Sequence, residues 1–127
     1  MTTTYSPTNP HQIADQAGIP VIYADPGEGN LGRWDGKHII LLPGLTWREE
    51  RSVLAHELSH ALHDDPPHLL RVLSPKIERR CDKEAAHMLI NPAELKKLLT
   101  AYPDDLGQVA YELEVTLDLL ETYLASP

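Results

Sequence analysis

Two histidines and a glutamate stand at a spacing that suits a metal site, because residues 56–60 read His-Glu-Leu-Ser-His. On a helix, residues four apart lie one above the other on the same face, so the imidazoles of His56 and His60 can bind one Zn²⁺ together. Glu57 is about 100° further round the helix than His56. It reaches the edge of the site, where a base for a metal-activated water belongs. The motif predicts one zinc per chain, with His56 and His60 as ligands and Glu57 as the catalytic base. The alternative is a solvated helix with two unrelated histidines.

A catalytic zinc usually has three protein ligands and one open position. The metzincin pattern would place Gly at position 63 and the third ligand at position 66, but these positions hold His63 and Pro66. The gluzincin pattern takes a Glu from a later helix, commonly with an acid or amide four residues on. Glu78 and Asp82 fit it. We expect Glu78 to bind the metal, and Asp82 to hydrogen-bond a ligand histidine and fix its tautomer. Glu84, the other candidate, lies about 240° round the same helix from Glu78.

Two further side chains near the motif have more than one interpretation. His63 lies three residues past His60 on the same face, so it is a candidate for stabilising an oxyanion or contacting substrate. The alternative is a partly exposed histidine at the helix end. Cys81 can approach a metal, but it falls on the apolar stripe of its helix, which favours a buried thiol.

The helix that carries the motif has clear local signals. Thr46 and Glu49 form a capping-box pattern, which opens a helix that we expect to run to about His63. Residues 64–67 (DDPP) then stop it. Its apolar stripe consists of Leu54, Leu58, Ala61 and Leu62.

Short strands are predicted before this helix. Residues 37–42 (KHIILL) form the most apolar run, and residues 20–24 (PVIYA) are a second candidate strand. The pair Asp35-Gly36 favours a tight type I′ turn, which would join residues 32–34 to the apolar run in a hairpin.

The other predicted helices flank this region. They are residues 9–18 with Asn9 as cap, 74–90 with Ser74 and Pro75 at its start, 91–102 with Asn91 as cap, and 104–124 with a break around 114–116. The order predicts an α+β fold: a small, mostly antiparallel sheet packed against the zincin helix core, and a mainly helical C-terminal half. We expect residues 1–8 to be a flexible tail and residues 9–127 to form one domain.

Composition limits the possible partners. The formal net charge is −8, which disfavours nucleic acid and anionic membrane surfaces. No apolar run approaches the ~20 residues that a membrane span needs, and residues 1–10 do not resemble a signal peptide. With Cys81 as the only cysteine, a cytoplasmic protein is expected. Nothing in the sequence determines the oligomeric state.

The segments HIILLPGL, RSVLAHELSHALHDD and ERRCDKEAAHMLINP, between His38 and Pro92, resemble the ImmA/IrrE family of metallopeptidases. Ser59 stands where that family usually has Gly, and Arg80 where many members have a second Glu. The resemblance implies a small α+β protein of a kind common in phages and mobile elements. It also implies a protein substrate, a cognate repressor, whose inactivation relieves repression.

Two classes of function follow. The first is a zinc-dependent endopeptidase that hydrolyses a peptide bond in a specific regulatory protein. The second is a non-catalytic module of the same fold, which inactivates a repressor by docking. Glu57 favours the enzyme, because a docking module has no need of a base.

Overall fold

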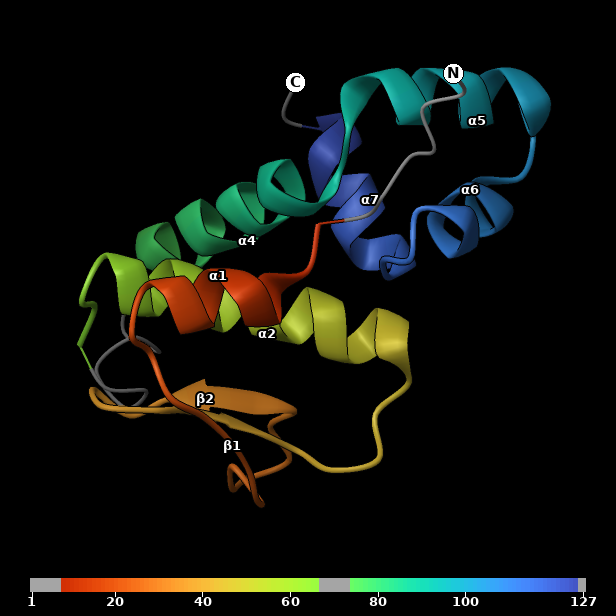
Figure 1. Ribbon diagram of the computed structural model, residues 1–127. Coiled ribbons are helices and arrows are strands. Elements are labelled where there is room, and N and C mark those ends of the chain that lie inside the picture. The colour runs from red at the N-terminus through yellow and green to blue at the C-terminus, as the bar shows by residue number, and fades with distance from the viewer. Residues whose placement is uncertain (1–7, 67–73, 126–127) are drawn as a thin grey trace.

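The computed structural model describes residues 8–66 and 74–125. Its elements are α1 (Pro10–Gln16), β1 (Val21–Tyr23), β2 (Gly32–Trp34), β3 (Ile39–Leu41), α2 (Trp47–Leu62), α4 (Pro75–Leu89), α5 (Pro92–Ala101), α6 (Leu106–Glu112) and α7 (Leu117–Ala125). In Figure 1 the sheet lies below α2 and α4 lies above it, while α5, α6 and α7 gather beyond the far end of α4. The predicted α+β fold with a helical C-terminal half is confirmed. No helix in this described part of the chain is long and apolar enough to cross a membrane.

The central helix α2 separates two buried apolar clusters. On one side Leu54 and Leu58 pack with the sheet and α1. On the other side Ala55 packs with α4 and the C-terminal helices. Because α2 is covered on both sides, some of its polar side chains are buried as well, and Arg51 and His60 are both 0% exposed. The helix is therefore a rigid support for the residues that it carries.

The sheet is mixed rather than mostly antiparallel. Its strand order is β1-β3-β2, with β2 antiparallel to β3 and β1 parallel to it. The three residues of β3, Ile39 to Leu41, are all buried, so the most apolar strand takes the centre and pairs on both edges. After β1 the chain crosses to the opposite edge of the sheet and forms β2. The hairpin then brings it back to the centre as β3, which runs parallel to β1. The pairing of β1 with β3 joins segments that are not adjacent in the sequence, and no sequence pattern predicted it.

The predicted hairpin between β2 and β3 is present, but its turn is not type I′. A type I′ turn needs positive φ at both central residues. The amide of Asp35 donates to the carbonyl of His38 at 3.2 Å, so the central residues are Gly36 and Lys37. Of these two, only Gly36 has a positive φ, 96°. The carboxylate of Asp35 instead accepts hydrogen bonds from the backbone amides of Lys37 and His38. An Asp side chain therefore closes the turn in place of a second left-handed residue.

Most predicted helix starts are confirmed. Thr46 and Glu49 form the full capping box at the start of α2. Asn9 and Asn91 cap α1 and α5 with their side chains. Ser74 differs, because its side chain makes no capping hydrogen bond, although Pro75 begins α4 as expected.

A buried cation ties α2 to the ends of other segments. The guanidinium of Arg51 donates to the backbone carbonyls of Thr8 at 2.8 Å, Leu113 at 2.8 Å, Glu114 at 3.0 Å and Leu89 at 3.3 Å. Several of these carbonyls lie at helix C-termini, where a positive charge is favourable. Arg51 thereby fixes α2 against the last turns of α4 and α6.

Candidate metal centre

The site forms where α2 and α4 pack against each other. The residues of α4 that face α2 include Ala85 and Ala86, which are 1% and 0% exposed. Small side chains let two helices approach closely. The close approach brings the first turn of α4, with Glu78, over the HExxH segment of α2.

Three side chains converge on one point. The Nε2 atoms of His56 and His60 lie 3.2 Å apart. The two carboxylate oxygens of Glu78 lie 3.0 Å from these atoms, Oε2 from His56 and Oε1 from His60. Ligand atoms of a tetrahedral zinc with bonds of about 2.0–2.1 Å are about 3.3 Å apart. The spacing and the donor types, two imidazoles and one carboxylate, therefore fit a catalytic zinc site.

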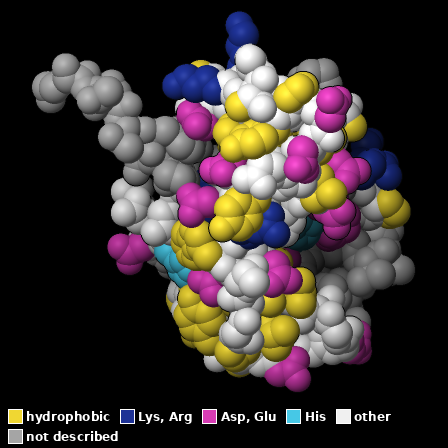
Figure 2. Space-filling model, turned by 90° about the vertical axis from the view of Figure 1, so that its right-hand side faces the viewer, with side chains coloured by type: hydrophobic (Ala, Val, Ile, Leu, Met, Phe, Trp, Pro, Cys, Tyr) yellow, Lys and Arg dark blue, Asp and Glu magenta, His cyan; other side chains and the backbone are white. Residues whose placement is uncertain are grey.

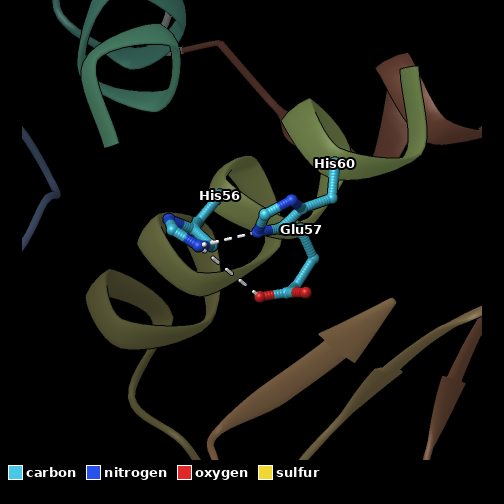
Figure 3. Close-up of side chains that lie close together, drawn as sticks. All are labelled: His56, Glu57 and His60. Atoms are coloured by element: carbon cyan, nitrogen blue, oxygen red, sulfur yellow. Dashed lines mark hydrogen bonds and ion pairs between the residues drawn. The ribbon is translucent and has the colours of Figure 1, made fainter. Parts of the chain in front are cut away.

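Glu57 lies beside this group rather than within it. Its Oε2 is 4.0 Å from His56 Nε2, and Figure 3 shows the carboxylate next to the two imidazoles. The side chain is nearly buried, because β2 passes close to it at Gly32. A Cβ atom at Gly32 would lie 2.5 Å from Val53 Cγ1 and 3.4 Å from Glu57 Cγ. A side chain at position 32 would have to displace Val53 where the strand covers the base, and no local sequence pattern pointed to this close packing.

Each imidazole also contacts a second carboxylate through Nδ1. Asp82 Oδ1 lies 2.8 Å from His56 Nδ1, as the gluzincin pattern predicted. Asp65 Oδ2 lies 3.0 Å from His60 Nδ1, a contact that was not foreseen. The sequence assigned Asp65 only to the helix stop. The signal that could have revealed it is its place just past the end of α2, one turn beyond a ligand histidine.

Glu84 and His63 lie outside the converging group. Glu84 accepts a hydrogen bond from Ser59 Oγ at 2.6 Å and lies 2.9 Å from His63 Nε2. The structure therefore pairs His63, the candidate for oxyanion or substrate contact, with Glu84. Glu84 faces a different side of α4 from Glu78, in agreement with the helix geometry.

The electrostatic environment favours a cation at this point. Burial alone would lower the pKa of His56, but hydrogen bonds with Asp82 and Glu78 and the charge of Glu57 raise it to about 10. Hydrogen bonds with His56 and His60 hold the pKa of Glu78 well below its ordinary value. Several carboxylates thus surround two imidazoles, which is a strongly negative setting for a bound metal ion.

A groove of about 560 Å³ opens beside the site. Its walls are the first half of α2, the start of β2, α4 at Asp82 and Ala85, and the region from Thr116 into α7. His56, Glu57 and Asp82 line it together with Asp118 and apolar residues such as Leu119. The volume lies within the range of ordinary ligand pockets. The base and one imidazole are therefore accessible from the groove.

Comparison with curated proteins and with solved structures gave no significant match. A family model described as the IrrE N-terminal-like domain, Peptidase_M78, matches residues 14–124. This range contains His56, His60, Glu78, Glu57 and every residue that lines the groove. The chain therefore belongs to the metallopeptidase family of IrrE N-terminal-like domains.

Proposed function

We propose that the protein is a zinc-dependent endopeptidase that hydrolyses a peptide bond in a specific regulatory protein, a repressor of a phage or mobile element. One observation carries the proposal. Two imidazole nitrogens and a carboxylate meet within 3.0–3.2 Å of one another, with a second carboxylate beside them. Family membership supports the same conclusion.

His56, His60 and Glu78 would hold the metal. Two histidines and one glutamate form one of the ligand sets that leave an open position on a catalytic zinc. When bound, zinc supplies Lewis-acid chemistry, which polarises a carbonyl and lowers the pKa of a water molecule from about 15.7 to about 7. Asp82 and Asp65 hold the rings of His56 and His60 through Nδ1, which leaves both Nε2 atoms available where a metal would bind.

Glu57 acts as the general base and then as the general acid. Its carboxylate takes a proton from the water that attacks the carbonyl carbon of the peptide bond. When the C–N bond breaks, Glu57 passes this proton to the leaving nitrogen. The nearly buried position of Glu57 beneath Gly32 fixes the carboxylate at the edge of the site, within reach of both groups.

The groove indicates the kind of substrate segment. Glu49, Asp82 and Asp118 line it in addition to Glu57, and its lining contains no Lys or Arg. On the side of the molecule shown in Figure 2, acidic and hydrophobic side chains alternate, while Lys and Arg lie mostly near the margins. Opposite charges favour encounter and selectivity. We therefore expect the cleaved segment to carry a basic side chain next to apolar ones, as in a basic repressor.

The test compares wild type with Glu57→Gln, each co-expressed with a candidate repressor. Gln has nearly the same shape but cannot take the proton, so zinc binding should persist while cleavage is abolished. Glu50→Gln is the matched control on the same helix, because Glu50 contacts His11 and Tyr23 rather than the site. It should cleave like wild type. If Glu57→Gln relieves repression as fully as wild type does, the protein acts by docking and the enzyme proposal is wrong.

A further inference from the structure

The turn that ends α2 places one carboxylate against a ligand histidine. Asp64 has φ 50°, and its amide donates to the carbonyl of Ala61 at 3.1 Å. The amide of Asp65 donates to the carbonyl of His60 at 2.9 Å. These two bonds form a Schellman motif, the common way to close a helix C-terminus. The motif returns the chain by one turn, so the residue after the left-handed position comes to lie beside the side chain of His60.

The side chain of Asp65 then contacts the imidazole of the same histidine. Asp65 is 7% exposed, and its Oδ2 lies 3.0 Å from His60 Nδ1. Arg80 Nη2 donates to the same oxygen, and the thiol of Cys81 lies 3.7 Å from it. Trp34 Nε1 donates to the backbone carbonyl of Asp65 at 3.3 Å. Asp65 is therefore held through its carboxylate from α4 and through its backbone from β2 and the end of α2.

This arrangement determines which nitrogen of His60 is available. Ionised carboxylates, which only accept hydrogen bonds, face both ring nitrogens of His60, Asp65 at Nδ1 and Glu78 at Nε2. When Nε2 holds a metal, the proton of a neutral His60 must be on Nδ1, where Asp65 accepts it. Nε2 is then left with its lone pair directed toward Glu78 and His56. Arg80 compensates the buried negative charge of Asp65, so the carboxylate can remain ionised without an unpaired charge in the interior.

We propose that Asp65, held by Arg80, is the positioning residue for His60. We also propose that the Asp65–His60 hydrogen bond contributes more to metal affinity than the Asp82–His56 hydrogen bond does. The proposal rests on the proposed zinc site. It gives a role to Arg80, one of the two residues at which the chain departs from the usual family pattern. The same few residues end α2 and orient its last ligand.

The two carboxylate–imidazole pairs differ in burial. The side chain of Asp65 is 7% exposed, whereas that of Asp82 is 53% exposed. A hydrogen bond shielded from water is stronger than one open to solvent. Loss of a carboxylate that orients a ligand histidine typically weakens metal binding about 10–100-fold. We expect Asp65→Ala to lie near the upper end of this range and Asp82→Ala near the lower end.

The experiment is a zinc titration of the metal-free full chain with a competing chelator, for wild type, Asp65→Ala, Asp65→Asn, Asp82→Ala and Asp64→Asn. Asp64→Asn is the matched control, because it removes a neighbouring charge and Asn tolerates the left-handed conformation. It should bind zinc like wild type. Asp65→Asn keeps an acceptor oxygen facing Arg80 and His60, so it should recover most of the affinity lost in Asp65→Ala. Equal affinity of Asp65→Ala and wild type, or an equal loss in Asp64→Asn, would overturn the proposal.

A second readout does not depend on how any variant folds. In zinc-loaded wild type, nitrogen-15 NMR of the imidazoles should show a slowly exchanging proton on His60 Nδ1. An unprotonated Nδ1 would refute the tautomer argument directly. This inference and the proposed function can fail separately. If Asp65→Ala binds zinc weakly but the protein cleaves no repressor, this inference stands and the enzyme proposal is wrong. If Asp65→Ala instead binds zinc like wild type, in a protein that does cleave the repressor, this inference is wrong and the enzyme proposal stands.

Discussion

Arg51 offers the sharpest test of how the fold holds α2 in place. We consider Arg51→Met, which keeps an unbranched apolar stem and removes the guanidinium. In the structure this group donates to four backbone carbonyls, and the bonds to Leu113 and Leu89 are buried. A buried carbonyl left without a partner costs about 1–3 kcal/mol. Two such losses amount to about 2–6 kcal/mol, offset in part because a buried cation no longer has to be desolvated.

We therefore expect Arg51→Met to lower the free energy of unfolding by about 3 kcal/mol. That is a large part of the ~5–15 kcal/mol typical of a small domain. The matched control is Arg48→Met, one turn earlier on α2. The guanidinium of Arg48 lies 5.4 Å from the Tyr111 ring centroid and makes one long bond of 3.4 Å to the Val115 carbonyl. Loss of such half-exposed contacts should cost less than about 1 kcal/mol.

The assay is urea unfolding followed by circular dichroism, with metal-free protein so that zinc binding does not add to the apparent stability. If Arg51→Met is within 1 kcal/mol of wild type, or no worse than Arg48→Met, the anchoring role of Arg51 is refuted.

Three further expectations concern the groove and the hairpin. Gly32→Ala should destabilise the protein by about 1–3 kcal/mol and reduce cleavage, because the added methyl meets Val53 at 2.5 Å; Gly107→Ala, at an exposed position of α6, should be neutral or slightly stabilising in the same unfolding assay. Asp118→Asn should raise KM for a substrate with a basic side chain while kcat stays near wild type, and an unchanged KM would remove this residue from substrate selection. Burial would raise the pKa of Asp35, but hydrogen bonds from two backbone amides and an imidazole hold it at about 2, below the ordinary 3.8. Asp35→Asn should therefore cost about 1 kcal/mol at pH 7, after allowance for partial exposure, and the difference should fade as pH falls from about 4 to about 2; a difference that persists at pH 2 would contradict this.

Local signals determined much of the fold. The capping box at Thr46 and Glu49, and the caps at Asn9 and Asn91, each depend on residues within one turn, and the sequence predicted them correctly. Positions four apart on one helix also placed His56 and His60 together. Such features depend only on the helical repeat.

What the sequence missed depends on tertiary packing. The parallel pairing of β1 with β3 joins segments separated by the hairpin, and no local pattern encodes it. The need for Gly32 appears only once β2 lies over α2. The contact of Asp65 with His60 needs the left-handed residue that closes α2, and the link to Arg80 needs α4 in place. Glu78 could be expected from a known motif spacing, but its contact with both imidazoles could not.

The central claim is that His56, His60 and Glu78 form the metal centre, and zinc titration of metal-free protein tests it most directly. Wild type should bind one zinc per chain. Glu78→Gln should lose more affinity than the ~10–100-fold typical of removing a hydrogen-bond partner of a ligand. Glu84→Gln, a charge-matched change on the same helix, should bind like wild type, because Glu84 contacts Ser59 and His63 instead. Absence of zinc binding in wild type, or a severe Glu84→Gln beside a mild Glu78→Gln, would contradict the account.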